Sequence, residues 1–178
     1  MIVHVTRLLS LALAIAALNS PPAIGAECLK QVFHTYCLGG NIDELTARKR
    51  PVVQTPQLDR NAFVFQDQGG YAYVGVFDGR IESVTRLYLP GTMRIYEEVR
   101  YPLRKVYGEG THSSTLPDYA RDSSTIELAI SLGQGGLLDS WQNQGWSILL
   151  VWDHPKRIAL TYRHDELHQK LHNNEARR

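Results

Sequence analysis

Apolar and polar residues alternate most clearly on the two sides of the dipeptide Asp78-Gly79. Alternation with a period of two predicts strands, and Asp-Gly suits the centre of a two-residue type I′ turn. We therefore predict a β-hairpin of Tyr71–Phe77 and Arg80–Leu89. The expected cross-strand pairs on one face are Val76 with Ile81, Val74 with Ser83, and Ala72 with Thr85.

The two faces of this predicted hairpin differ in chemistry. One face is small and apolar and should pack on helices, whereas the other is aromatic and charged and should meet water or a partner. Tyrosine and arginine are enriched at interaction hot spots. The candidate protein-binding residues on this second face are Tyr71, Tyr73, Glu82 and Arg86. The alternative interpretation is an ordinary solvated sheet face.

Two further patterns predict three more strands. Thr125–Leu132 alternates apolar and polar residues and is predicted to be a half-buried strand. Trp146–Trp152 and Arg157–Arg163 are predicted to form a second hairpin, whose first strand is apolar on both faces, as in the centre of a sheet. The glycine-rich segment 133–136 lies between these patterns and is interpreted as a flexible turn.

Helical signals separate the predicted strands. Asn41 and Glu44 have the spacing of a capping box, which predicts a short helix that ends near Arg50. Apolar residues at helical spacing predict a second helix over Thr92–Tyr107, which Pro102 should kink or restart.

The remaining segments complete the predicted order of elements. Residues 51–61 and 111–122 are predicted loops, and the segment from Asp165 to the C-terminus can form an amphipathic helix. The expected order is helix, helix, two or three strands, helix, three strands, helix. This order predicts an α+β fold with a single antiparallel sheet and helices packed on one face. The two halves resemble loose copies, each with a helix before an antiparallel meander.

The first 26 residues have the composition of a secretory signal peptide. One fixed positive charge lies within Met1–Arg7, an apolar run follows over Leu8–Leu18, and small residues fill 23–26. The apolar run of about eleven residues is too short for a bilayer, which needs about twenty. We therefore predict a signal peptide over 1–26 and a single domain over 27–178.

Two cysteines, Cys28 and Cys37, follow the predicted signal peptide directly. In an oxidising compartment such cysteines usually pair. In one continuous helix they would lie about 13.5 Å apart, whereas a disulfide needs Cα atoms within about 7 Å, so the chain must turn back or unwind between Lys30 and Tyr36. Glu27 stands where bacterial lipoprotein processing needs a small residue. We expect a disulfide-bonded, soluble, exported protein in a Gram-negative periplasm.

Charge and hydropathy argue against two kinds of partner. The chain has a formal net charge of +1, which becomes 0 when Arg7 is removed with the signal peptide, whereas nucleic-acid binding needs a basic surface. The richest later apolar run, Ile148–Trp152, is far shorter than a membrane span. We predict no nucleic-acid partner and no membrane-embedded segment, and no pattern indicates a cofactor.

Two motifs carry a resemblance to known proteins. They are Leu38-Gly39-Gly40-Asn41-Ile42-Asp43-Glu44-Leu45 and Tyr73-Val74-Gly75-Val76-Phe77-Asp78-Gly79-Arg80-Ile81. From Phe33 to Ile81 the chain resembles the BamE/SmpA-like family of small outer-membrane assembly lipoproteins, and also β-lactamase inhibitor proteins that share a helix-helix-sheet unit. In those families a short helix started by glycine precedes strands that meet at an acidic residue and a glycine.

The chain departs from that pattern in two ways. It has no lipid-anchor cysteine, and its linker over 51–60 is long and contains prolines. The resemblance implies a non-catalytic envelope protein whose sheet face or loops bind another protein.

The C-terminal segment offers the best candidate for metal chemistry. His164, His168 and His172 follow one another at four-residue steps. On a helix they would lie near one face, and imidazoles at i and i+4 can share Zn²⁺, Cu²⁺ or Ni²⁺. Leu167 and Leu171 give the same segment an ordinary apolar stripe. The alternative is therefore that the histidines form the solvated edge of that helix.

Other candidates for chemistry have simpler explanations. The serines near His112 lie in a predicted loop without a nucleophile elbow. The glycine-rich segment 133–136 lacks the lysine of a phosphate-binding loop. Core packing explains the cluster of Trp141, Trp146 and Trp152, with a partner-anchoring tryptophan as the alternative.

Together these patterns predict a non-catalytic, soluble, exported protein-binding module of the bacterial envelope, such as an assembly factor, an inhibitor or an immunity-type protein. The expected partner is another protein of the cell envelope. The alternatives are a periplasmic metal-handling protein that uses the histidine tail, and an envelope hydrolase whose site shows no motif.

Overall fold

The computed structural model describes residues 28–56 and 61–177, so the predicted signal peptide lies outside the described residues. The helices are α1 (Ile42–Arg48), α2 (Met93–Tyr107), α3 (Ser123–Ser131) and α4 (Asp165–Glu175). The strands are β1 (Lys30–Val32), β2 (Tyr36–Leu38), β3 (Val53–Pro56), β4 (Asn61–Asp67), β5 (Gly70–Phe77), β6 (Arg80–Tyr88), β7 (Thr111–Ser114), β8 (Leu137–Gln142), β9 (Trp146–His154) and β10 (Arg157–His164). The predicted α+β class is confirmed.

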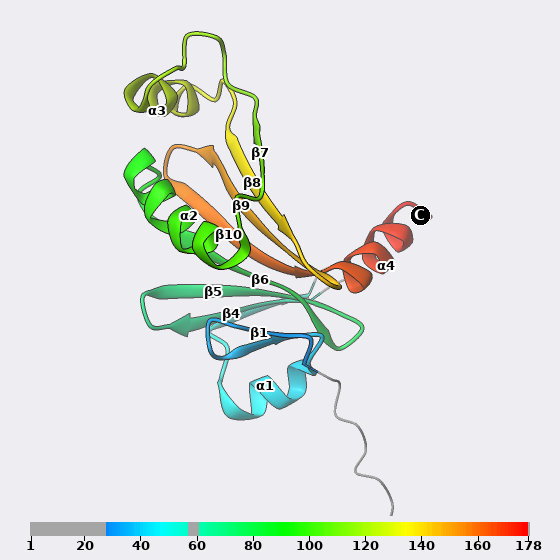
Figure 1. Ribbon diagram of the computed structural model, residues 1–178. Helices are drawn as coiled ribbons and strands as arrows, with labels where there is room; N and C mark the ends of the chain where they lie inside the picture. Colours follow the sequence, from blue (N-terminus) through cyan, green and yellow to red (C-terminus); the bar gives the residue numbers. More distant parts are fainter. Residues whose placement is uncertain (1–27, 57–60, 178) are drawn as a thin grey trace, which may run out of the picture.

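Eight strands form one antiparallel sheet in the order β3-β4-β5-β6-β10-β9-β8-β7, beside a small β1–β2 hairpin. The first half consists of α1 followed by the meander β3 to β6. The second half consists of α2 followed by β7 to β10, with α3 inserted between β7 and β8. The last strand of each half lies at the centre, where β6 pairs with β10 (Figure 1). The expected likeness of the two halves therefore holds for their topology.

One face of the sheet is covered by α1, α2 and the β1–β2 hairpin. Tyr96 on α2 packs against Trp152, with ring centroids 5.9 Å apart. On the other half, Tyr36 of β2 packs against Phe65, and both rings are fully buried. Buried apolar side chains of this covered face form one core with residues from both halves.

Helix α4 lies on the opposite face, at the end of the sheet where β10 finishes (Figure 1). Its first residue, Asp165, accepts a 2.7 Å hydrogen bond from Ser147 Oγ on β9. Ser147 is in register with Arg163 and therefore points away from the core. The prediction that the helices pack on one face was thus wrong for α4, because its apolar residues Leu167 and Leu171 are buried at this end of the other face.

The hairpin around Asp78-Gly79 is confirmed, but its register changes within the strands. Val76 pairs with Ile81 as predicted, and a bulge next to this pair then shifts the partners by one residue. Val74 therefore faces Val84 rather than Ser83. A bulge moves every side chain beyond it to the other face relative to simple pairing. The predicted composition of the two hairpin faces was consequently wrong on β6.

The segment predicted as a strand over Thr125–Leu132 is instead helix α3. Asp122 caps this helix, because its carboxylate accepts from the Thr125 N–H and the Thr125 hydroxyl accepts from the Asp122 N–H. Ala129 and Ile130 are fully buried, whereas Leu128 is 50% exposed. The apolar residues thus follow a helical stripe, and their alternation in the sequence was a coincidence of spacing.

The segment between the cysteines is a β-hairpin and not a helix. Cys28 and Cys37 form the predicted disulfide, with Cα atoms 5.4 Å apart. The chain reverses at Phe33 and His34, which both have positive φ angles. The disulfide is therefore confirmed, and the expected reversal between Lys30 and Tyr36 takes the form of a tight turn.

Four strands of the large sheet, β3, β4, β7 and β8, lie in places to which no strand was assigned from the sequence. β3 and β7 are the four-residue edge strands of the sheet and lie within predicted loops. β8 follows the glycine-rich turn, and Trp141 within it is buried. Edge strands are short and have few apolar residues, so alternation does not reveal them. The predicted helices that begin near Asn41, Thr92 and Asp165 are confirmed as α1, α2 and α4, with Thr92 capping α2 and Asn41 capping α1.

Candidate functional site

The structure separates the four predicted protein-binding residues. Tyr71 and Tyr73 are 50% and 41% exposed and lie on the sheet face opposite the core, so their predicted exposure is confirmed. Glu82 is 1% exposed and lies beneath α4. Arg86 belongs to the covered face, because it pairs with the buried Ala72 across β5 and β6. The bulge in this hairpin explains both errors.

Arg86 contributes to the packing of the β1–β2 hairpin on the sheet. Its Nη2 atom donates to Asp67 Oδ2 at 2.8 Å, and its guanidinium lies 3.9 Å from the centre of the Phe33 ring. Asp67 also lies 3.4 Å from Lys49 Nζ. Burial opposes ionisation of Asp67, but the Gln68 N–H and these two cations outweigh it and hold the pKa of Asp67 below its usual value.

The face opposite the core is open and uncharged over its central part. One line of residues, each the cross-strand neighbour of the next, runs across all eight strands from β3 to β7. Every side chain in this line is exposed or half-buried, and none carries a charge. The line consists of Val53, Val64, Tyr73, Thr85, Thr161, Leu149, Ser140 and Thr111.

A second line beside it has the same character. It comprises the pair Gln66–Tyr71 and the run Leu87, Ala159, Val151, Leu138 and Ser113. We call these two lines the open face. Seven spacings between adjacent strands make this face about 34 Å wide. About a fifth of the chain is charged, so two uncharged lines that cross eight and seven strands are a distinct surface.

The residues of the open face on β8, β9 and β10 were not identified as candidates from the sequence. Each strand contributes only two of them, as the solvent-facing half of an ordinary alternating pattern. Only the strand order shows that Thr161 lies beside Thr85, to which its hydroxyl is hydrogen-bonded at 2.8 Å.

The histidine tail does not form the predicted three-residue set. His164 ends β10 and is the N-cap of α4, where its Nδ1 accepts a long bond from the Leu167 N–H. It is 7% exposed; burial, followed by the nearby Arg80, lowers its pKa. His168 and His172 lie one turn apart on the helix, and their Nε2 atoms are 3.0 Å from each other. No group of three or more potential metal-binding side chains occurs among the described residues.

A second titratable cluster surrounds Asp139, which is completely buried. Tyr96 donates to it at 2.7 Å, Arg100 lies 2.7 Å away, and His112 Nδ1 is at 2.9 Å. Burial and this carboxylate raise the pKa of Tyr96 well above its usual value. A carboxylate that orients an imidazole is also part of hydrolase triads. However, His112 has no hydrogen bond to a hydroxyl among the described residues, so the cluster lacks the nucleophile of such a triad. We interpret it as a structural contact that joins α2 to β7 and β8.

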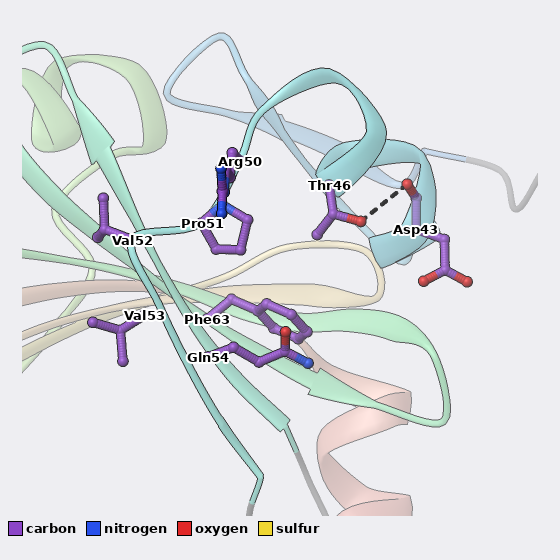
Figure 2. A pocket seen from close by; sticks show the side chains of 8 residues that line it. All are labelled: Asp43, Thr46, Arg50, Pro51, Val52, Val53, Gln54 and Phe63. Atoms are coloured by element: carbon purple, nitrogen blue, oxygen red, sulfur yellow. Dashed lines mark hydrogen bonds between the residues drawn. The ribbon is translucent and has the colours of Figure 1, made fainter.

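A cleft of about 450 Å³ lies between α1 and the strands β3 and β4. Figure 2 shows its lining side chains, of which Asp43 and Arg50 are charged and lie apart from each other. The one hydrogen bond between lining residues joins the Thr46 hydroxyl to the Asp43 carbonyl oxygen. This cleft therefore brings together no pair of titratable groups for acid–base chemistry.

The three tryptophans are buried and belong to the core, as the packing interpretation predicted. In the part of the chain that the structure describes, no helix is long and apolar enough to cross a membrane. Comparison of the chain with protein families, curated proteins and solved structures gave no significant match.

Proposed function

We propose that this chain is a protein-binding module that docks a partner protein on its open face. The observation that carries the proposal is the pair of uncharged lines of side chains, one across all eight strands and the other across the seven from β4 to β7. A surface of this width matches the extent of a standard protein interface and exceeds that of a small-molecule pocket.

The composition of the open face also supports a protein partner. Interface centres are depleted in charged residues and enriched in tyrosine, and tyrosines with serine and threonine provide adaptable contacts. Tyr71 and Tyr73 lie side by side with Gln66 and Val64 on β4. We infer that the partner is a folded protein with an uncharged contact surface, because a charged one would lose its hydration there without gaining a counter-charge.

We further propose that the protein acts outside the cytosol, in the cell envelope. The Cys28–Cys37 disulfide supports this location, because disulfides persist mainly in oxidising compartments. The envelope partner predicted from the resemblance agrees with this proposal. We propose that the protein binds its partner without catalysing a reaction.

Site-specific photo-cross-linking tests the face directly. Tyr73→benzoylphenylalanine should give a covalent adduct with one protein of defined mass in the organism's own envelope. The matched control is the same replacement of Tyr101, which is 60% exposed on α2 and should give no such adduct. Adducts at position 101 alone, or no protein adduct at position 73, would contradict the proposal.

The affinity for the partner then tests how much Tyr73 contributes to binding. With the cross-linked partner purified, Tyr73→Ala should weaken binding at least about tenfold, as truncation of a central aromatic anchor does. Tyr101→Ala should bind like the wild type. Equal affinities of wild type and Tyr73→Ala would remove the tyrosine from the binding centre.

A further inference from the structure

The pair His168 and His172 forms a cluster of nitrogen atoms that the proposed function does not use. Their Nε2 atoms lie 3.0 Å apart, and the rings are perpendicular with centroids 4.3 Å apart. The His172 side chain is 59% exposed and that of His168 is 24% exposed. An ion from solvent can therefore reach the two nitrogens.

Carboxylates hold the other nitrogen of each ring. His168 Nδ1 lies 2.7 Å from Oε1 of the buried Glu82, and His172 Nδ1 lies 3.2 Å from Glu175 Oε2. Arginine can only donate, and Arg163 Nη1 lies 3.0 Å from His168 Nε2, so this Nε2 has a lone pair and the proton of His168 is on Nδ1. In the metal-free protein the 3.0 Å contact between the two Nε2 atoms makes His172 Nε2 the donor, and an ion replaces this proton once His172 is protonated on Nδ1 toward Glu175.

This arrangement has the properties of a two-histidine metal site. Histidines that bind metals usually donate their second N–H to a carboxylate, which orients the ring and raises its basicity. Two nitrogens 3.0 Å apart, each about 2.0 Å from an ion, subtend about 95° at that ion. That angle is close to the 90° between neighbouring ligands of a tetragonal ion and smaller than the tetrahedral angle of about 109°.

We propose that His168 and His172 bind a divalent transition-metal ion of tetragonal preference, Cu²⁺ before Ni²⁺, through their Nε2 atoms. Water completes the coordination, since no third protein ligand lies near these nitrogens among the described residues. Glu82 and Glu175 orient the rings and offset part of the ion's charge. Cu²⁺ is favoured over Ni²⁺ and Zn²⁺ by the general order of affinities for nitrogen ligands.

Arg163 limits the affinity of this site. Its Nη1 atom lies 3.0 Å from His168 Nε2 and donates to the same lone pair that the ion needs. The guanidinium also repels a second cation. Removing this side chain should therefore strengthen metal binding, which is the reverse of the effect expected for a residue that merely supports the fold.

Isothermal titration with CuCl₂ and NiCl₂ on the metal-free protein tests the proposal. His172→Asn should weaken Cu²⁺ binding at least tenfold, and Arg163→Gln should strengthen it at least threefold. The matched control is His34→Asn, which changes an exposed histidine in the β1–β2 turn and should leave the affinity unchanged.

NMR identifies the ligands independently of the affinities. Substoichiometric Ni²⁺ or Cu²⁺ should broaden the imidazole signals of His168 and His172 before those of the other histidines. Undiminished Cu²⁺ affinity of His172→Asn, or unchanged affinity of Arg163→Gln, would overturn the proposal. Because Tyr73 lies outside this cluster, the result is independent of partner binding at the open face.

Discussion

Asp67 illustrates how single residues join separate elements of this protein. It lies at the end of β4, and two cations from different elements contact its carboxylate: Arg86 of β6 and Lys49, which follows α1. Its side chain is 12% exposed, so these contacts are only partly screened by water. The sequence pattern placed Arg86 on the exposed face, because a strand without a bulge was assumed.

We predict that this carboxylate makes stability depend on pH in the acidic range. The pKa of Asp67 in the folded protein lies below its usual value, so the folded state binds fewer protons than the unfolded state. Its stabilising contribution is fully present above about pH 5, and it is lost as the pH falls through about 4 toward the lower folded-state pKa.

Urea unfolding of wild type and Asp67→Asn measures this contribution. At pH 7 the variant should be less stable by about 1–2 kcal/mol, because charge-assisted hydrogen bonds are lost. The difference should shrink as the pH is lowered to 3. Asp43→Asn, on the exposed first turn of α1, serves as the control. A wild-type advantage that is equal at pH 7 and pH 3 would contradict the assignment.

At the scale of elements, α3 depends on its capping interactions. The helix has nine residues, too few to be stable alone. Asp122 and Thr125 exchange hydrogen bonds at its start, and the helix buries Ala129 and Ile130. Capping and burial together outweigh the alternating pattern that suggested a strand.

We predict that Asp122→Ala destabilises the protein by about 1 kcal/mol, the usual cost of removing an N-cap side chain. Asp118→Ala is the matched control, because this exposed aspartate lies in the preceding turn and its side chain makes no hydrogen bond among the described residues. Chemical unfolding of both variants provides the measurement. Equal stability of Asp122→Ala and wild type would show that the cap contributes nothing.

At the scale of the whole molecule, the two halves share one core. The central strands β6 and β10 pair over six residues of each, and most of the buried apolar residues of both halves form a single cluster. Neither half can keep its inner strand paired when the other unfolds. The halves are therefore related in topology but dependent on each other in stability.

We predict a single cooperative unfolding transition for the disulfide-bonded protein. Tryptophan fluorescence reports only the second half, because all three tryptophans lie between residues 141 and 152, whereas far-UV circular dichroism reports both halves. The urea midpoints of the two signals should coincide. Midpoints that differ reproducibly would mean that the halves unfold separately.

The local features of this protein were predictable from its sequence. The turn at Asp78-Gly79, the cap at Asn41 and the limits of α2 at Thr92 and Gly108 all agree with the structure. Each depends on interactions between residues a few positions apart, so a short segment contains all the information needed. The pairing of the cysteines followed from their number and the predicted export, and the chain reversal between them from their spacing.

Tertiary structure alone decided which side chains share a surface. A one-residue bulge moved Glu82 and Arg86 from the predicted face, and the pairing of β6 with β10 brought Thr85 beside Thr161 across 76 positions of sequence. The open face and the carboxylate beneath His168 both depend on such long-range register. No local pattern encodes it, because strand order and register are selected by the burial of the whole core.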